Sequence, residues 1–132
     1  VDDRIKALLL VPDNQLATAK ARKLLPESIS HQDAVLNSSR TALLVHALAE
    51  RPDLLFRATE DLLHQSYRAQ AMPKTIALVD KLRGAGLAAV VSGAGPSVMV
   101  LYAGSEDEID QLQSIAPGFT ARKLAIAKAG VQ

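Results

Sequence analysis

The stretch of sequence that decides the fold reads LAAVVSGAGPSVMVLY and covers residues 87–102. Its two short apolar runs, residues 87–91 and 97–102, are rich in valine, as is typical of buried strands. The five residues between them contain two glycines and a proline. A connection of this length favours two strands that run side by side in opposite directions. We therefore expect an antiparallel strand pair joined by a glycine-containing loop.

The segments on either side of this pair add a strand at each end of the chain and several helices. An apolar run that ends at Pro12 predicts a first strand over residues 5–11, and the Pro117-Gly118 turn precedes a last strand over residues 119–127. Capping residues and prolines predict helices over residues 15–25, 31–49, 52–71 and 73–83, and one more after the capping box at 105–108.

The order of these elements predicts an α+β fold in a single domain, residues 1–132. A ferredoxin-like sandwich has this pattern: strand, helices, strand, strand, helix and strand. We expect a four-stranded antiparallel sheet with helices packed on one side, and extra helices inserted after the first strand.

The composition of the chain excludes several classes of protein and of site. A net charge of +1 gives no electrostatic attraction for nucleic acid or an anionic membrane. The absence of cysteine excludes disulfides, thiolate metal sites and a cysteine nucleophile, and suits a cytoplasmic protein. Residues 84–105 carry no charge, but the glycines and the proline among them argue against a membrane helix. The chain opens on Val1, so we expect a fragment of a longer protein.

The glycine loop is the strongest candidate for a functional segment. It is not a dinucleotide fingerprint, because a strand follows it where that motif needs a helix, and it lacks the Gly-Lys-Ser/Thr of a Walker loop. Two readings stay open: the glycines supply turn geometry, or they permit close approach of another group. With its flanking serine, the loop comprises Ser92, Gly93, Ala94, Gly95, Pro96 and Ser97.

Two further positions carry side chains that bind carboxylates. Thr18 and Arg22 lie four residues apart on a predicted helix, so they share a face on which a hydroxyl and a guanidinium can hold an anion. Arg68 stands alone near a predicted helix end. A solvated helix face is the simpler interpretation for Thr18 and Arg22, and snorkelling or capping is the simpler one for Arg68. The histidines have no metal-ligand spacing, and no catalytic base or metal site can be assigned.

The glycine loop and three other segments resemble the GHMP small-molecule kinases. Residues 91–98 are similar to the third motif of that superfamily. Residues 18–26 (TAKARKLLP), together with residues 33–40 and the pairs Tyr67-Arg68 and Met72-Pro73, resemble the C-terminal half of the homoserine kinase family. These segments occur in the family's order, and the likeness extends from about residue 8 to residue 127.

The resemblance implies an activity and a set of roles. The family phosphorylates the hydroxyl of L-homoserine with ATP and Mg²⁺ in threonine biosynthesis. Thr18, Arg22 and Arg68 match positions on the homoserine side of the cleft, and the glycine loop matches the motif that closes on the phosphate-binding loop. That loop, and most of the ATP and magnesium site, belong to an N-terminal domain whose motifs this sequence lacks.

Two hypotheses therefore stay open. The chain is either the substrate-side domain of such a kinase, inactive alone and binding no cofactor by itself, or a free-standing α+β module that binds an amino acid without catalysis. Neither involves nucleic acid or a membrane. The sequence leaves the oligomeric state of the parent undecided, with a homodimer among the allowed states.

Overall fold

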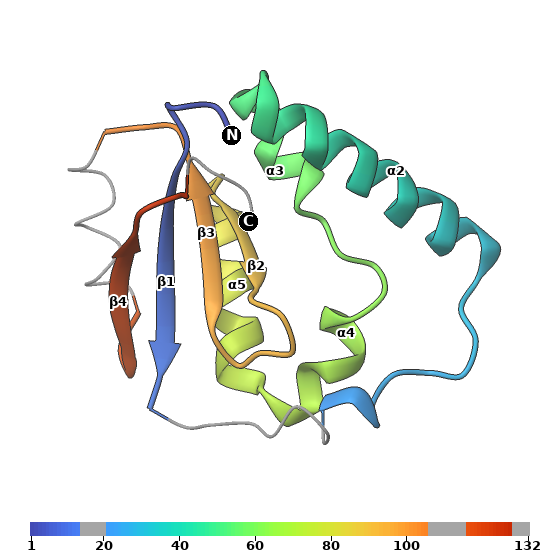
Figure 1. The fold of residues 1–132 in the computed structure, drawn as a ribbon. Coiled ribbons are helices and arrows are strands. Elements are labelled where there is room, and N and C mark those ends of the chain that lie inside the picture. Colours follow the sequence, from blue (N-terminus) through green and yellow to red (C-terminus); the bar gives the residue numbers. More distant parts are fainter. Residues whose placement is uncertain (14–20, 106–115, 128–132) are drawn as a thin grey trace.

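The computed structural model describes residues 1–13, 21–105 and 116–127, and within them four strands form one antiparallel sheet. The strands are β1 (Lys6–Pro12), β2 (Ala88–Val91), β3 (Val98–Tyr102) and β4 (Phe119–Leu124). Their order across the sheet is β2-β3-β1-β4, so the first strand of the chain lies in the middle (Figure 1). The α+β architecture with a four-stranded antiparallel sheet is confirmed, as is the antiparallel pairing of β2 with β3.

One face of the sheet packs against α5 (Pro73–Gly84). Alternate residues of the central strands point to this face, and the pairs Leu8↔Val100 and Leu10↔Val98 are fully buried in register. Leu82 of α5 completes the same core cluster. The sheet is therefore held by a compact aliphatic core, as the shortage of aromatic residues requires.

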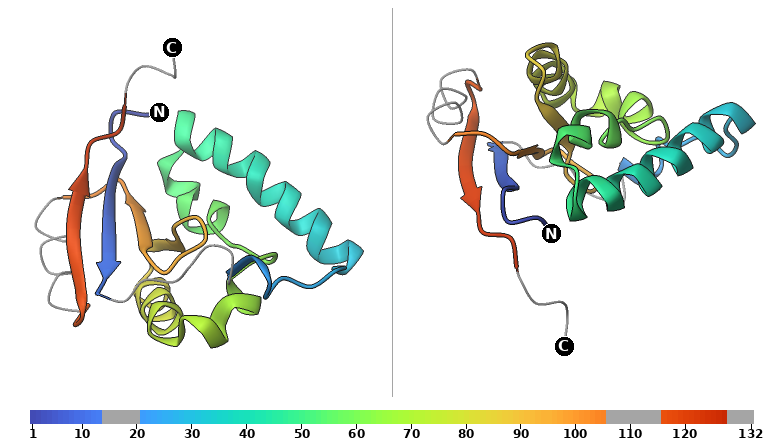
Figure 2. Two further views of the ribbon diagram at one scale, coloured as in Figure 1. Left: turned by 60° about the horizontal axis from the view of Figure 1, so that its bottom comes forward. Right: turned by 90° about the horizontal axis from the view of Figure 1, so that it is seen from above.

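The extra helices lie beside the other face, near the β2 edge (Figure 2). They are α2 (His31–Ala49), η1 (Pro52–Leu54), α3 (Leu55–Ala58), α4 (Gln65–Arg68) and η2 (Ala69–Ala71). A second, smaller cluster joins Ala47 and Leu55 to Ile5 and Ala88 of the sheet. The far end of α2 extends beyond the sheet, as both views of Figure 2 show.

The helix expected over residues 31–49 has these bounds, and the Ser30 hydroxyl caps it by accepting a 3.0 Å hydrogen bond from the Asp33 amide. The continuous helical region expected over residues 52–71 is wrong, because four short helices separated by a turn take its place. Most of the expected helix 15–25, and the helix expected after residue 105, fall outside the described residues. No helix in the ranges listed above is long and apolar enough to cross a membrane.

Candidate functional site

The glycine loop is a tight turn closed by its own backbone. The Ser92 amide donates a 2.8 Å hydrogen bond to the Ser97 carbonyl, and the Gly95 amide donates one of 3.0 Å to the Ser92 carbonyl. Gly93 and Gly95 adopt φ angles of +58° and +82°, which side-chain-bearing residues rarely take. Glycine at both positions is thus a requirement of the turn.

Gly95 meets a second requirement, because its α-carbon lies against the core. A Cβ built there would stand 2.7 Å from the Met72 Sδ and 3.0 Å from the Val91 Cγ1. A Cβ on Gly93 would meet no atom within 4 Å. Close approach therefore occurs at Gly95, and the group that approaches it belongs to this chain.

Side chains of α4 hold the near end of the glycine loop. The Gln65 Oε1 accepts a 2.6 Å hydrogen bond from the Val91 amide, where β2 ends. One turn later, Arg68 Nη1 donates a 3.1 Å hydrogen bond to the Gly93 carbonyl. Two side chains of one short helix thus fix the direction in which the chain leaves the sheet.

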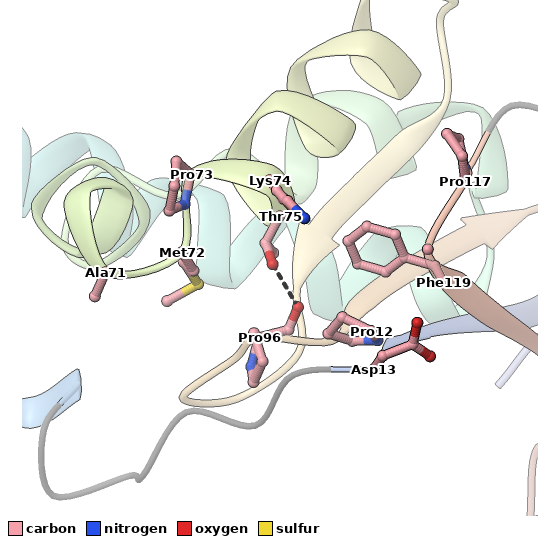
Figure 3. Close-up of a pocket in the computed structure, with 11 residues that line it drawn as sticks. Pro12, Asp13, Ala71, Met72, Pro73, Lys74, Thr75, Pro96, Pro117 and Phe119 are labelled. Atoms are coloured by element: carbon pink, nitrogen blue, oxygen red, sulfur yellow. Dashed lines mark hydrogen bonds between the residues drawn. The ribbon is translucent and has the colours of Figure 1, made fainter.

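The start of α5 holds the far end of the loop. The Thr75 hydroxyl donates a 2.8 Å hydrogen bond to the Pro96 carbonyl, and Thr75 is almost completely buried (Figure 3). Met72, just before the helix, lies under Gly95. The spacing of these residues, Gln65, Arg68, Met72 and Thr75, is that of one face of a helix, although the chain passes here through two short helices and into α5.

Arg68 is the most unusual side chain in this arrangement. Only 6 % of its surface is exposed, and its Nε makes no hydrogen bond. Within the described part of the chain, no carboxylate forms an ion pair with it. A buried charge without a partner is costly. The Nε is thus a buried N–H donor that no described group of the chain satisfies.

Arg68 lines a cavity of about 360 Å³ between α2, α4 and the end of β2. Most of the side chains around this cavity are polar, and they come from α2 and from the segment that leads into α4. The polar lining besides Arg68 includes Asn37, Arg40, Glu60, Asp61, His64 and Gln65.

A second cavity of about 280 Å³ lies on the other side of the glycine loop (Figure 3). Its walls are mainly apolar and include Pro12, Met72, Pro96 and Phe119, with Lys74 at the start of α5. The two cavities share no lining residue, so the loop and its anchoring side chains separate them.

The structure brings two of the predicted site segments together and leaves the third apart. Arg68 and the glycine loop are in direct contact through Gly93. Arg22 is exposed, and the segment that carries it runs beside α4 in Figures 1 and 2. Thr18 lies outside the described residues. His31, His46 and His64 do not meet, and no described group of three His, Asp or Glu side chains could hold a metal ion.

Sequence reasoning missed Gln65, Met72 and Thr75. Their spacing relative to Arg68 was visible, but the loop that they contact lies about 20 residues further along the chain. The available signal was the polarity of Gln65 and Thr75 at positions on the same helical face as Arg68, since buried polar side chains need partners.

Comparison with known proteins assigns the fold to a family of enzymes. Residues 39–118 match the family described as GHMP kinases C terminal. The chain is 48% identical over 129 residues to the homoserine kinase of Streptomyces coelicolor, covering 97% of this chain and 41% of that protein. It is 60% identical over 97 residues to the homoserine kinase of Leifsonia xyli, covering 74% and 30%.

A solved structure supports the architecture. The homoserine kinase of Cytophaga hutchinsonii superposes with a TM-score of 0.81 at 24% identity, over 96% of this chain and 43% of that one. The chain thus spans about two fifths of the length of the relatives it resembles. Together with the match over most of its length, the antiparallel sheet and the glycine loop show that this chain belongs to the GHMP kinase C-terminal domain family.

Proposed function

We propose that this chain is the C-terminal, substrate-side domain of a homoserine kinase. The full-length enzyme transfers the γ-phosphoryl group of ATP to the hydroxyl of L-homoserine and releases O-phospho-L-homoserine, in the cytoplasm. The names of the relatives and the share of their length that this chain covers support the proposal. Residues 1–132 then form one domain, and a separate N-terminal domain completes the enzyme.

The observation that carries the proposal is Arg68, which is buried and forms no ion pair with a carboxylate of the described residues. Homoserine is an amino acid, and its carboxylate is an anion that a guanidinium binds well, because planar N–H donors match the two oxygens. The buried Nε has no acceptor among the described residues, and the cavity that Arg68 lines is the route by which a carboxylate would approach the guanidinium.

Arg22 and Thr18 have a secondary role in this proposal. Arg22 is exposed, and its role in this proposal is to approach the same ligand from the solvent side. Two arginines on one carboxylate would hold homoserine by its common amino-acid end. The hydroxyl to be phosphorylated then points away from this domain.

ATP and Mg²⁺ find no matching donor set in the described residues. No three metal-ligating side chains gather in them, and no lysine borders the glycine loop's backbone turn in the manner of a phosphate-binding loop. We therefore assign nucleotide and magnesium to the N-terminal domain. The glycine loop, from Ser92 to Ser97, is the surface that we expect to close on that domain's phosphate-binding segment.

The test is a homoserine kinase assay on the full-length protein, with Arg68→Met compared against Arg57→Met. Arg57 is an exposed arginine of α3 and serves as the matched control. Loss of a charge-assisted hydrogen bond should raise the KM for homoserine roughly tenfold to hundredfold and leave the KM for ATP unchanged. Equal effects of the two substitutions would contradict the proposal. Homoserine binding without phosphoryl transfer would favour the non-catalytic amino-acid-binding module.

A further inference from the structure

The cavity at Arg68 contains two carboxylates, yet neither pairs with Arg68. Glu60 and Asp61 both line it, together with the guanidinium. In a buried site, opposite charges normally pair, since attraction is strong where water is scarce. The separation of these charges therefore needs a cause, and the contacts of each carboxylate supply one.

Arg40 forms an ion pair with the first carboxylate, that of Glu60. Its Nε lies 2.6 Å from the Glu60 Oε2, and the guanidinium is mostly buried, with 19% of the side chain exposed. Asn37, one turn earlier on α2, accepts a 3.1 Å hydrogen bond from the Leu62 amide and fixes the same segment. Glu60 is thereby held toward α2.

Backbone amides donate hydrogen bonds to the second carboxylate, that of Asp61. Asp61 accepts hydrogen bonds from the amides of Leu63, His64 and Gln65, at 3.1, 3.2 and 2.7 Å. Its Oδ1 also lies 3.0 Å from the His64 Nδ1. All of these contacts are at the start of α4, where a carboxylate satisfies amides that have no partner within the helix.

The third residue that leaves Arg68 without a carboxylate partner is Gln65, whose side chain is neutral. The Val91 amide needs an acceptor, and a glutamate at this position could provide one as well as the glutamine does. Residues 65 and 68 are three apart on α4, so a carboxylate at 65 would also lie within reach of Arg68. The neutral amide fulfils the structural role without neutralising the arginine.

We propose that Gln65, Arg40 and the Asp61 cap are specificity residues that keep the Arg68 guanidinium free of any protein counter-ion. This inference rests on the proposed function, because it assigns the reserved charge to the carboxylate of the substrate. Arg40 and Asp61 act by holding acids away, and Gln65 acts by being an uncharged acceptor. None of the three needs to touch homoserine.

Gln65→Glu tests the inference directly, with Ser66→Glu as the matched control. Ser66 is the next residue of α4 and is exposed, so the control adds the same charge to the same helix away from the cavity. Gln65→Glu should raise the Tm of the chain above that of Ser66→Glu, because Arg68 gains a partner. In the full-length kinase it should raise the KM for homoserine about tenfold, with the KM for ATP unchanged.

A double substitution separates this effect from a general gain in stability. In an Arg68→Met background, Gln65→Glu should no longer raise the Tm, because the pair cannot form. A lower Tm for Gln65→Glu than for Ser66→Glu, or an equal gain with and without Arg68, would overturn the inference.

The proposed function fails in a different way. If Arg68→Met left the KM for homoserine unchanged while the coupling between positions 65 and 68 persisted in the Tm, the arrangement of charges would stand. Its assignment to the homoserine carboxylate would then be wrong.

Discussion

Thr75 and Pro96 are joined by a hydrogen bond of 2.8 Å in which the threonine hydroxyl is the donor. The hydroxyl belongs to the first turn of α5, and the carbonyl belongs to the glycine loop. The bond therefore fixes the position of the loop relative to the helix. Thr75 is only 2% exposed, whereas Pro96 is half-buried, so the threonine hydroxyl is the shielded partner of the bond.

Thr75→Val should destabilise the chain by about 1–3 kcal/mol, because the Pro96 carbonyl loses its donor in a buried place. Thr75→Ser keeps the hydroxyl and serves as the control. Urea unfolding followed by circular dichroism measures both. If valine proved as stable as serine, the hydrogen bond would not be what holds the loop against α5.

The two glycines of the loop should respond differently to alanine. Gly93→Ala has open space but a left-handed φ, so it should cost about 1–2 kcal/mol. Gly95→Ala has the same strain and must in addition displace the buried end of Met72, so its cost should be larger. Chemical denaturation of the two variants would decide the order. A smaller loss at Gly95 would show that Met72 moves aside freely.

The isolated chain should neither phosphorylate homoserine nor hydrolyse ATP. Phosphoryl transfer depends on donors and a metal that stabilise the charge of the transferring group, and the described residues offer no metal site. A coupled assay for ADP on the purified chain is the measurement. Homoserine-dependent turnover above the blank would refute the proposal that ATP and magnesium are bound by the N-terminal domain.

Arg22→Ala in the full-length kinase should raise the KM for homoserine by tenfold to a hundredfold and leave the KM for ATP in place, since it removes one charge-assisted hydrogen bond. Melting temperatures must be compared, because a general loss of folding would lower both affinities. Lys23→Ala is the control, as a neighbouring exposed cation. A parallel rise of both KM values would exclude a substrate-side role for Arg22.

Local signals in the sequence were sufficient for the sheet and the longest helix. Ser30 and the prolines on either side predict α2 with correct ends, because capping and proline geometry act over a few residues. The valine-rich runs predict β2 and β3 for the same reason. The order of elements predicted the ferredoxin-like class, and the strand order β2-β3-β1-β4 is a finding of the structure.

The region after Pro52 shows where local reasoning failed. Its apolar pattern favours a helix, but Thr59 donates to the Leu55 carbonyl and Asp61 accepts from three following amides. Such side chains offer the backbone alternative partners and end or restart helices. The contacts of Gln65 and Thr75 with the glycine loop depend on tertiary packing, which no short-range pattern contains.

The position of β1 in the centre of the sheet has a consequence for how the protein is made. Leu8 is synthesised roughly ninety or more residues before its partners Val100 and Lys123. The hairpin of β2 and β3 can close as soon as it leaves the ribosome, whereas β1 must wait for both neighbours. Contacts so distant in sequence slow folding. A ribosome that stalls before residue 119 therefore releases a chain with β1 exposed along one edge, open to pairing with another copy.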